Sequence, residues 1–262
     1  MESRVRRRVK REAWFHRYPR GLPVALFLLM ALLTMATVGM LESNERDQRA
    51  LMLERNATEV SSALQQREAE HLAYLRAAAA LITRQRGVDA AMIEGFHRDL
   101  GDNLAQLGAL GLGWVEVVPA DQRAAIEARQ RARGYPDFRI WPAPDPASST
   151  AMAVLYLFPR NHINARTIGF DMATAPLRRD ALERAARLRR PVATGRVQLV
   201  QDGDGDPTPG FLIYMPVFDP ATGALRGQVY SPFRASEFLA SANRLHVTRR
   251  IGVALYDGPE LD

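Results

Sequence analysis

A run of twenty uncharged residues near the N-terminus constrains this chain more than any other feature. The run extends from Leu22 to Leu41 and reads LPVALFLLMALLTMATVGML. At about 1.5 Å per residue, a helix of this length spans roughly 30 Å, the thickness of the hydrocarbon core of a bilayer. Charged residues stop at both ends, with Arg20 before the run and Glu42 after it. We therefore expect a transmembrane signal anchor over residues 22–41.

The positive charge of the chain lies almost entirely in the segment before this run. Residues 1–21 hold eight basic and two acidic residues, whereas the remaining chain holds 27 of each sign. The net charge of +6 therefore belongs to a tail and not to a nucleic-acid-binding surface, and no nucleic acid partner is expected. Because basic flanks stay in the cytoplasm, we predict a single span of the cell inner membrane, with a cytoplasmic basic tail over residues 1–21 and residues 42–262 in the periplasm.

A cleaved signal peptide is the alternative interpretation of this N-terminal segment. Its basic start fits such a peptide, but the apolar run exceeds the usual length of about 7–15 residues. The triplets that end at Ala36 and Gly39 are only weak cleavage sites. We therefore favour an uncleaved anchor.

Residues 42–86 contain neither proline nor glycine and predict one long stalk helix. Apolar residues at heptad spacing occur at Leu53, Ala57, Val60 and Leu64. The same register then meets Arg67 and His71, so the apolar pattern is interrupted. Two interpretations stay open: an amphipathic helix that packs on its own domain, or a stalk that forms a homodimer through residues 42–86.

Beyond Gly87, short helices and clustered strands replace the long helix. We expect helices over 90–100, 121–133, 176–189 and 235–243, and strands over 108–118, 138–141, 153–159, 167–171, 195–201, 210–218, 226–231 and 251–256. Asp121 is the expected N-cap of the second helix and Gly134 its C′ residue. Strands that follow one another without a helix between each pair indicate an antiparallel sheet, so the predicted fold class is α+β.

The helix expected over 176–189 has a recognisable apolar stripe. Pro176 suits its first turn, where a missing N–H costs nothing. The stripe consists of Leu177, Ala181, Leu182, Ala185 and Leu188. We expect this stripe to be the buried face of the helix.

The sequence contains no recognisable catalytic or metal-binding motif. Cysteine is absent, no HExxH, GxSxG or P-loop pattern occurs, and none of the five histidines forms an i, i+4 pair. Asp202, Asp204 and Asp206 begin like a calcium loop. However, Pro207 stands where that loop needs glycine and Ile213 where it needs glutamate, so a polar hairpin loop is the preferred interpretation. We predict no catalytic residue, no metal and no cofactor.

An ordered set of segments resembles a known family. The segments read LGWVEVVP from Leu112, GYPDFRIW from Gly134, FPRN from Phe158, IGFDM from Ile168, QLVQ from Gln198, GFLIYMPV from Gly210 and YSPFR from Tyr230. In this order and spacing they resemble the CHASE domain, the extracytoplasmic sensing module of bacterial receptor kinases and cyclases and of plant cytokinin receptors. No single segment is specific, whereas the ordered set, which covers residues 75–240, is informative.

The resemblance implies an architecture as well as a sensing role. Family members have a long N-terminal helix followed by two PAS-like lobes, and the membrane-distal lobe holds the ligand. We accordingly expect a CHASE-like ligand-sensing domain over residues 87–245 and the start of a truncated membrane-proximal lobe over residues 246–262. Family members also carry a cytoplasmic output domain, so we expect a fragment of a larger receptor or a truncated gene product.

The resemblance also implies candidate ligand-binding residues. In plant cytokinin receptors, an aspartate early in the helix after the Asp–Met pair binds adenine, and an ungapped alignment places Arg178 there. A donor-only cation replaces an acceptor, so we expect an anionic ligand such as a carboxylate, and not a cytokinin. Thr194 and Tyr214 occupy the positions of two family threonines and would form hydrogen bonds with the ligand. Trp141 and Phe211 would line the same pocket. The alternative is that Arg178 is a surface residue on an exposed turn.

Two functions from different classes follow from these observations. The first is the ligand-sensing input region of a bacterial transmembrane receptor of the two-component type, whose absent output domain is a histidine kinase or a diguanylate cyclase or phosphodiesterase. Its partners would be a small-molecule ligand and the inner membrane. The alternative is a signal-anchored envelope hydrolase whose active site is not visible in the sequence. A nucleophile–base pair or metal cluster would favour the hydrolase, and because no such motif is present we expect no enzymatic activity from this chain.

Overall fold

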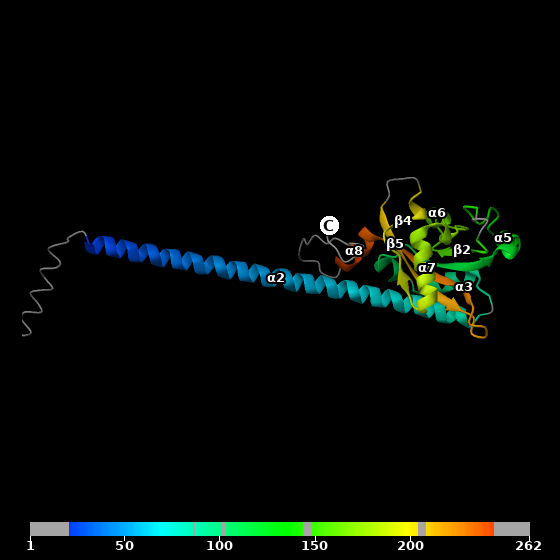
Figure 1. Ribbon diagram of the computed structural model, residues 1–262, viewed down its shortest axis with the longest axis horizontal. Coiled ribbons are helices and arrows are strands. Elements are labelled where there is room, and N and C mark those ends of the chain that lie inside the picture. Colours follow the sequence, from blue (N-terminus) through cyan, green and yellow to red (C-terminus); the bar gives the residue numbers. More distant parts are fainter. Residues whose placement is uncertain (1–20, 86, 101–102, 144–147, 204–207, 244–262) are drawn as a thin grey trace, which may run out of the picture. The chain divides into compact units, whose positions relative to one another are not determined.

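The computed structural model describes residues 21–85, 87–100, 103–143, 148–203 and 208–243 (Figure 1). The chain divides into two compact units, the first ending at Glu59 and the second beginning at Val60. The basic tail predicted over 1–21, apart from its last residue, lies outside the described residues, as do the strand over 251–256 and the lobe start over 246–262.

The first unit contains most of the apolar part of helix α2 (Gly21–Thr83). Within the described residues, this is the one helix long and apolar enough to cross a membrane, over Pro23–Leu41 with a mean hydropathy of 2.4. Its large apolar side chains are exposed, as expected for a surface that faces lipid. The hydroxyls of Thr34 and Thr37 donate to the carbonyls of Met30 and Leu33, so these polar groups are satisfied within the helix.

The second unit includes the C-terminal part of α2, which packs against a sheet. His71, Leu75, Ala78 and Ile82 recur at helical spacing and are all buried. This part of the helix is therefore amphipathic and belongs to the core of its own domain. Ala57 is exposed and Val60 is half-buried, so the earlier part of the apolar pattern is only partly covered. The homodimer through residues 42–86 stays a prediction.

Within the part of the chain that the structure describes, six antiparallel strands form one sheet. Their bounds are β1 (Leu112–Pro119), β2 (Thr150–Phe158), β3 (Val192–Ala193), β4 (Val197–Gln198), β5 (Pro209–Phe218) and β6 (Leu225–Arg234). The order is β2-β1-β6-β5-β3, and β4 also pairs with β5. The predicted fold class, α+β with an antiparallel sheet, is confirmed.

The remaining helices are short. They are α3 (Ala90–Leu100), α4 (Asn103–Gln106), α5 (Arg123–Ala132), α6 (His162–Ala165), α7 (Pro176–Leu188) and α8 (Ala235–Asn243). The described residues also form three 3-10 turns: η1 (Ala120–Gln122) between β1 and α5, η2 (Met172–Thr174) before α7, and η3 (Val200–Asp202) between β4 and β5. The predicted helices over 90–100 and 235–243 agree with α3 and α8 at both ends.

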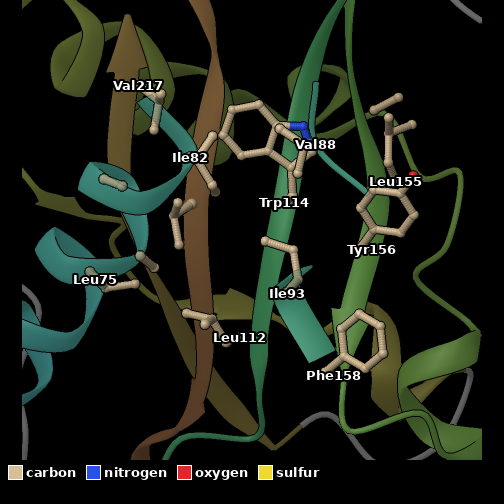
Figure 2. Close-up of a cluster of buried hydrophobic side chains, with 14 of the residues drawn as sticks. Leu75, Ile82, Val88, Ile93, Leu112, Trp114, Leu155, Tyr156, Phe158 and Val217 are labelled. Carbon is tan, nitrogen blue, oxygen red and sulfur yellow. The ribbon is translucent and has the colours of Figure 1, made fainter. Parts of the chain in front are cut away.

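Each face of the sheet carries its own hydrophobic core. Leu75 and Ile82 of α2 and Ile93 of α3 meet Leu112 and Trp114 on one face, as Figure 2 shows. On the other face, α7 packs on the sheet: its Ala181, Leu182 and Ala185 share a core with the strand residues Val115, Leu157, Tyr214 and Tyr230. Because successive residues of a strand point to opposite faces, β1 contributes Trp114 to the first core and Val115 to the second. Each such large apolar side chain stabilises the fold by about 1.5–3 kcal/mol.

The predicted strand over 138–141 is wrong. Phe138 and Ile140 are buried, which produces the alternation seen in the sequence, but apart from one isolated bridge from Trp141 to Phe170 the segment pairs with no described strand. Side chains of α5 take the place of a neighbouring strand. The N–H of Ile140 donates to Glu127 at 3.0 Å, and its carbonyl accepts from Arg123.

Three other local predictions need correction. Asp121 lies inside η1, and Gln122 is the N-cap of α5. The segment predicted as a strand over 167–171 is a turn that ends in isolated bridges at Phe170 and Asp171. The strand predicted over 195–201 is reduced to β4, because η3 follows almost at once. Gly134 does end α5 with a φ of 93°, as its predicted C′ role requires.

Candidate ligand-binding site

Helix α7 covers the second face of the sheet and places Arg178 in the protein interior. The helix runs from Pro176 to Leu188, and its C-cap residue, Arg189, is left-handed with a φ of 51°. Its buried side chains are Arg178, Ala181, Leu182 and Ala185. The predicted stripe included Leu177 and Leu188 instead, but these are 53% and 44% exposed. Arg178 is only 5% exposed, so its interpretation as a surface residue is wrong.

The guanidinium of Arg178 is held by few polar contacts. Its Nη2 donates to the carbonyl of Gln198 at 2.6 Å, and its central carbon lies 5.1 Å from the centre of the Phe170 ring. Nε is buried and finds no acceptor among the described residues, and no described carboxylate forms an ion pair with Arg178. Burial lowers the pKa of Arg178, because the charged form is desolvated. The site therefore holds a buried cation that has no counter-ion among the described residues.

Two buried tyrosines lie beside this cation. The ring centres of Tyr214 and Tyr230 are 6.1 Å apart, and both side chains are fully buried. Tyr214 Oη donates only to the sulfur of Met172, at 3.5 Å. Burial outweighs the nearby Thr167 hydroxyl, which acts to lower the pKa of Tyr230, and Tyr230 Oη has no hydrogen-bond partner among the described residues. Burial raises the pKa of both phenols, so both stay protonated and act as donors.

Thr194 and Trp141 lie on the same face of the sheet but have other hydrogen-bond partners. Thr194 Oγ1 accepts from the N–H of Leu212 at 3.0 Å and donates to the carbonyl of Gly195 at 2.7 Å. The hydroxyl therefore braces the backbone between β3 and β5. Trp141 packs edge-on against Phe170 at 4.9 Å and donates its indole N–H to the carbonyl of Ile168. It reaches Arg178 only through the Phe170 ring.

Phe211 does not lie in this cluster, which corrects the prediction that it shares a pocket with Tyr214. The two residues are three positions apart on β5, so their side chains point to opposite faces. Phe211 stacks on Phe233 at 4.8 Å and meets Phe238 of α8 edge-on. It belongs to the core beneath α2. The odd spacing on one strand is a signal that could have separated the two residues.

A groove on the α7 side of the sheet was not predicted. It has a volume of about 450 Å³ and is bounded by α7, η2 and the starts of β2 and β6. The polar residues that line it include Asp171, Arg179, Glu183 and Gln228. Gln228 lies 45 residues beyond Glu183 in the sequence, and only this glutamine in strand β6 hinted at a polar site there. Arg178 is not among the lining residues.

The fold and these sites define an α+β sensor-type domain that follows an apolar helix. A family model of the CHASE domain matches residues 87–262, more than half of the chain. This chain therefore belongs to the CHASE domain family, which consists of sensor domains. No curated protein matches the chain.

Solved structures are similar to the chain over part of their length. An extracellular ligand binding receptor from Desulfohalobium retbaense DSM5692 is 17% identical with a TM-score of 0.40, covering 70% of this chain and 27% of that chain. The ligand binding domain of the Pseudomonas aeruginosa PAO1 amino acid chemoreceptor PctC, in complex with GABA, is 14% identical with a TM-score of 0.41, covering 71% and 64%. An RNA-binding light-oxygen-voltage receptor is 14% identical with a TM-score of 0.30, covering 62% and 39%. This chain spans less than two thirds of each of these structures.

Proposed function

We propose that this chain is the extracytoplasmic ligand-sensing input region of a bacterial transmembrane receptor, and that Arg178 binds an anionic group of its small-molecule ligand. The observation that supports this assignment is a buried guanidinium with no carboxylate partner among the described residues. Membership in a family of sensor domains supports the sensing role. The output domain is a histidine kinase or a diguanylate cyclase or phosphodiesterase, on the cytoplasmic side of the inner membrane.

The polar groups of the cluster favour an anion because they are donors. Arg178 Nε, Tyr214 Oη and Tyr230 Oη each carry a hydrogen that is unused or weakly used in the described residues. A buried charge without a partner is costly, and a ligand carboxylate would offset that cost while accepting these hydrogens. A charge-assisted hydrogen bond of this kind contributes about 1.5–3 kcal/mol, or about 10- to 150-fold in affinity.

The same arrangement supports binding over hydrolysis. A hydrolase needs a nucleophile beside a base, and the buried hydroxyl of Thr194 is engaged with two backbone groups. The phenols beside Arg178 have raised pKa values, so they are poor bases at neutral pH. We therefore propose that this chain binds its ligand without transforming it.

A thermal-shift experiment on the full chain in detergent tests the role of Arg178. The probes are butyrate, succinate and benzoate, each paired with its neutral amide, which keeps the size and shape of the probe but removes the charge and replaces an acceptor oxygen with an N–H donor group. Arg178→Met removes the guanidinium and keeps an apolar side chain of similar length. Arg184→Met is the matched control, because Arg184 is an exposed arginine on the same helix.

We expect at least one carboxylate to raise the melting temperature of the wild type and of Arg184→Met. The same carboxylate should not stabilise Arg178→Met, and the amides should stabilise none of the three proteins. Equal stabilisation of Arg178→Met, or a preference for the amides, would show that Arg178 is not an anion receptor.

A further inference from the structure

We infer that the groove between α7 and the starts of β2 and β6 is a second binding site, which takes a small organic cation through its amine. The groove has a volume of about 450 Å³, within the range of small-molecule sites. Its chemistry differs from that of the Arg178 cluster, because two carboxylates and an amide oxygen without a described donor outnumber its one arginine. The inference goes beyond the proposed function and does not depend on Arg178.

Gln228 provides the observation that points to a ligand. Its side chain is fully buried, lines the groove, and donates from Nε2 to the carbonyl of Leu182 at 2.8 Å. This bond fixes the orientation of the amide, because the flipped form would set two oxygens against each other. Oε1 then finds no donor among the described residues. A buried acceptor without a donor is costly, and an N–H from a ligand would satisfy it.

Two carboxylates add negative charge to the groove. Asp171 is 3% exposed, and its Oδ1 accepts from the N–H groups of Met152 and Ala173 at 2.9 and 3.0 Å. These bonds hold the carboxylate in place at the groove wall. Glu183 lies on the exposed side of α7 and forms no ion pair with any described cation. The acceptors thus come from three separate elements: the turn before η2, helix α7 and strand β6.

One guanidinium also lines the groove, and it is partly engaged. Arg179 donates from Nε to the carbonyl of Ala173 at 2.6 Å. The lining therefore carries two carboxylates and an unpartnered amide oxygen against one arginine. The balance favours a ligand with a positive charge and several N–H donors, which an ammonium group supplies.

The rest of the groove sets the shape of the ligand. Met152, Leu182 and Leu225 contribute apolar surface beside the polar groups. A short alkyl chain would bury this surface while its ammonium group faces Gln228, Asp171 and Glu183. The site therefore fits a small alkylamine better than an inorganic cation, which would require a shell of oxygen ligands and no apolar wall.

The test uses three four-carbon probes that differ only in their polar group: n-butylammonium, butyrate and n-butanol. Binding is measured by saturation-transfer NMR on the full chain in lipid nanodiscs, with empty nanodiscs as the blank. Glu183→Gln removes a groove carboxylate from an exposed position, so folding is retained. Asp180→Asn is the matched control, because it removes the same charge from the same helix outside the groove. Gln228→Met removes the unpartnered oxygen.

We expect saturable binding of n-butylammonium to the wild type. Glu183→Gln should weaken it about two- to fivefold, and Gln228→Met about tenfold or more, whereas Asp180→Asn should leave it unchanged. Equal weakening by Asp180→Asn, or no saturable binding of the amine by the wild type, would overturn the inference.

The Arg178→Met variant separates this inference from the proposed function. We expect it to bind n-butylammonium as the wild type does and to prefer the amine over butyrate and butanol. Loss of amine binding in Arg178→Met would overturn the second site. If the chain binds the amine but no carboxylate stabilises it in the thermal-shift experiment, the role of Arg178 is overturned and the assignment of the groove is supported.

Discussion

Replacing His71 with leucine should stabilise the chain, and more strongly in acid. His71 lies on α2, is 1% exposed, and packs edge-on against Phe233 with ring centres 4.6 Å apart. Neither imidazole nitrogen has a hydrogen-bond partner among the described residues. A leucine would fill the same interior position without any polar group to desolvate.

The magnitude follows from the shift in the pKa of His71. Burial lowers this pKa from 6.5 to about 4, because the charged imidazolium is desolvated between α2 and the sheet. As the pH falls below 6.5, the unfolded chain takes up a proton before the folded chain does. The contribution of a neutral His71 to the free energy of unfolding is therefore fully present above pH 6.5. It is lost as the pH falls to about 4, and below that pH it does not change further. At about 1.4 kcal/mol per pKa unit, the loss amounts to about 3 kcal/mol.

Thermal unfolding of the full chain in detergent, followed by tryptophan fluorescence between pH 7.5 and 4, measures this effect. A loss of about 3 kcal/mol corresponds to about 6–12 °C in a domain of this size. We expect His71→Leu to have a higher melting temperature than the wild type at pH 7.5. The difference between the two melting temperatures should be larger by about 6–12 °C at pH 4. His162→Leu, at an exposed histidine, is the control and should run parallel to the wild type. A parallel curve for His71→Leu, or a lower melting temperature at pH 7.5, would refute the reasoning.

Two further predictions concern the membrane segment and the sheet. Because Pro23–Leu41 is apolar enough to span a membrane, a reporter fused after residue 60 should be active in the periplasm, and the N-terminus should be intact. A mature N-terminus near residue 37, found by mass spectrometry, would contradict the anchor. Gly113→Ala should lower the free energy of unfolding by about 1–3 kcal/mol in a denaturant titration, because a Cβ there would lie 2.3 Å from Tyr230 Cε1 and 2.7 Å from the Tyr156 carbonyl. Unchanged stability would mean that β1 and the Tyr230 ring can move apart at little cost.

The elements that were predictable are those whose pattern comes from their own residues. Helices α3 and α8 match the predicted ranges, and α7 differs by one residue at its end. The segment over 138–141 was not predictable, because burial at alternate residues has two possible causes. A strand satisfies its backbone through a neighbouring strand, whereas this segment does so through Glu127 and Arg123 of α5. Only the tertiary structure distinguishes these cases.

The candidate sites also differ in how far the sequence could predict them. Aligning the chain with a family placed Arg178 near the start of α7, but Leu177 appeared to be the buried neighbour. Adjacent residues on a helix point about 100° apart, so a small rotation of the predicted face exchanges Leu177 for Arg178. The groove could not be predicted from the sequence, because it brings Asp171, Glu183 and Gln228 together from a turn, a helix and a strand.

Strand β6 offers a physical route from these sites to helix α2, which carries the candidate membrane span. Tyr230 and Gln228 lie on its α7 face, and Phe233 on the opposite face contacts His71 of α2. The same strand begins near the end of α2, where Arg226 donates to the carbonyls of Ile82 and Gln85 at 3.1 and 2.8 Å. A ligand that engages Tyr230 would therefore act on a strand that is already fastened to α2 at two points. Because packed interiors resist compression, we expect such a displacement to reach α2 and not to be absorbed within the sheet.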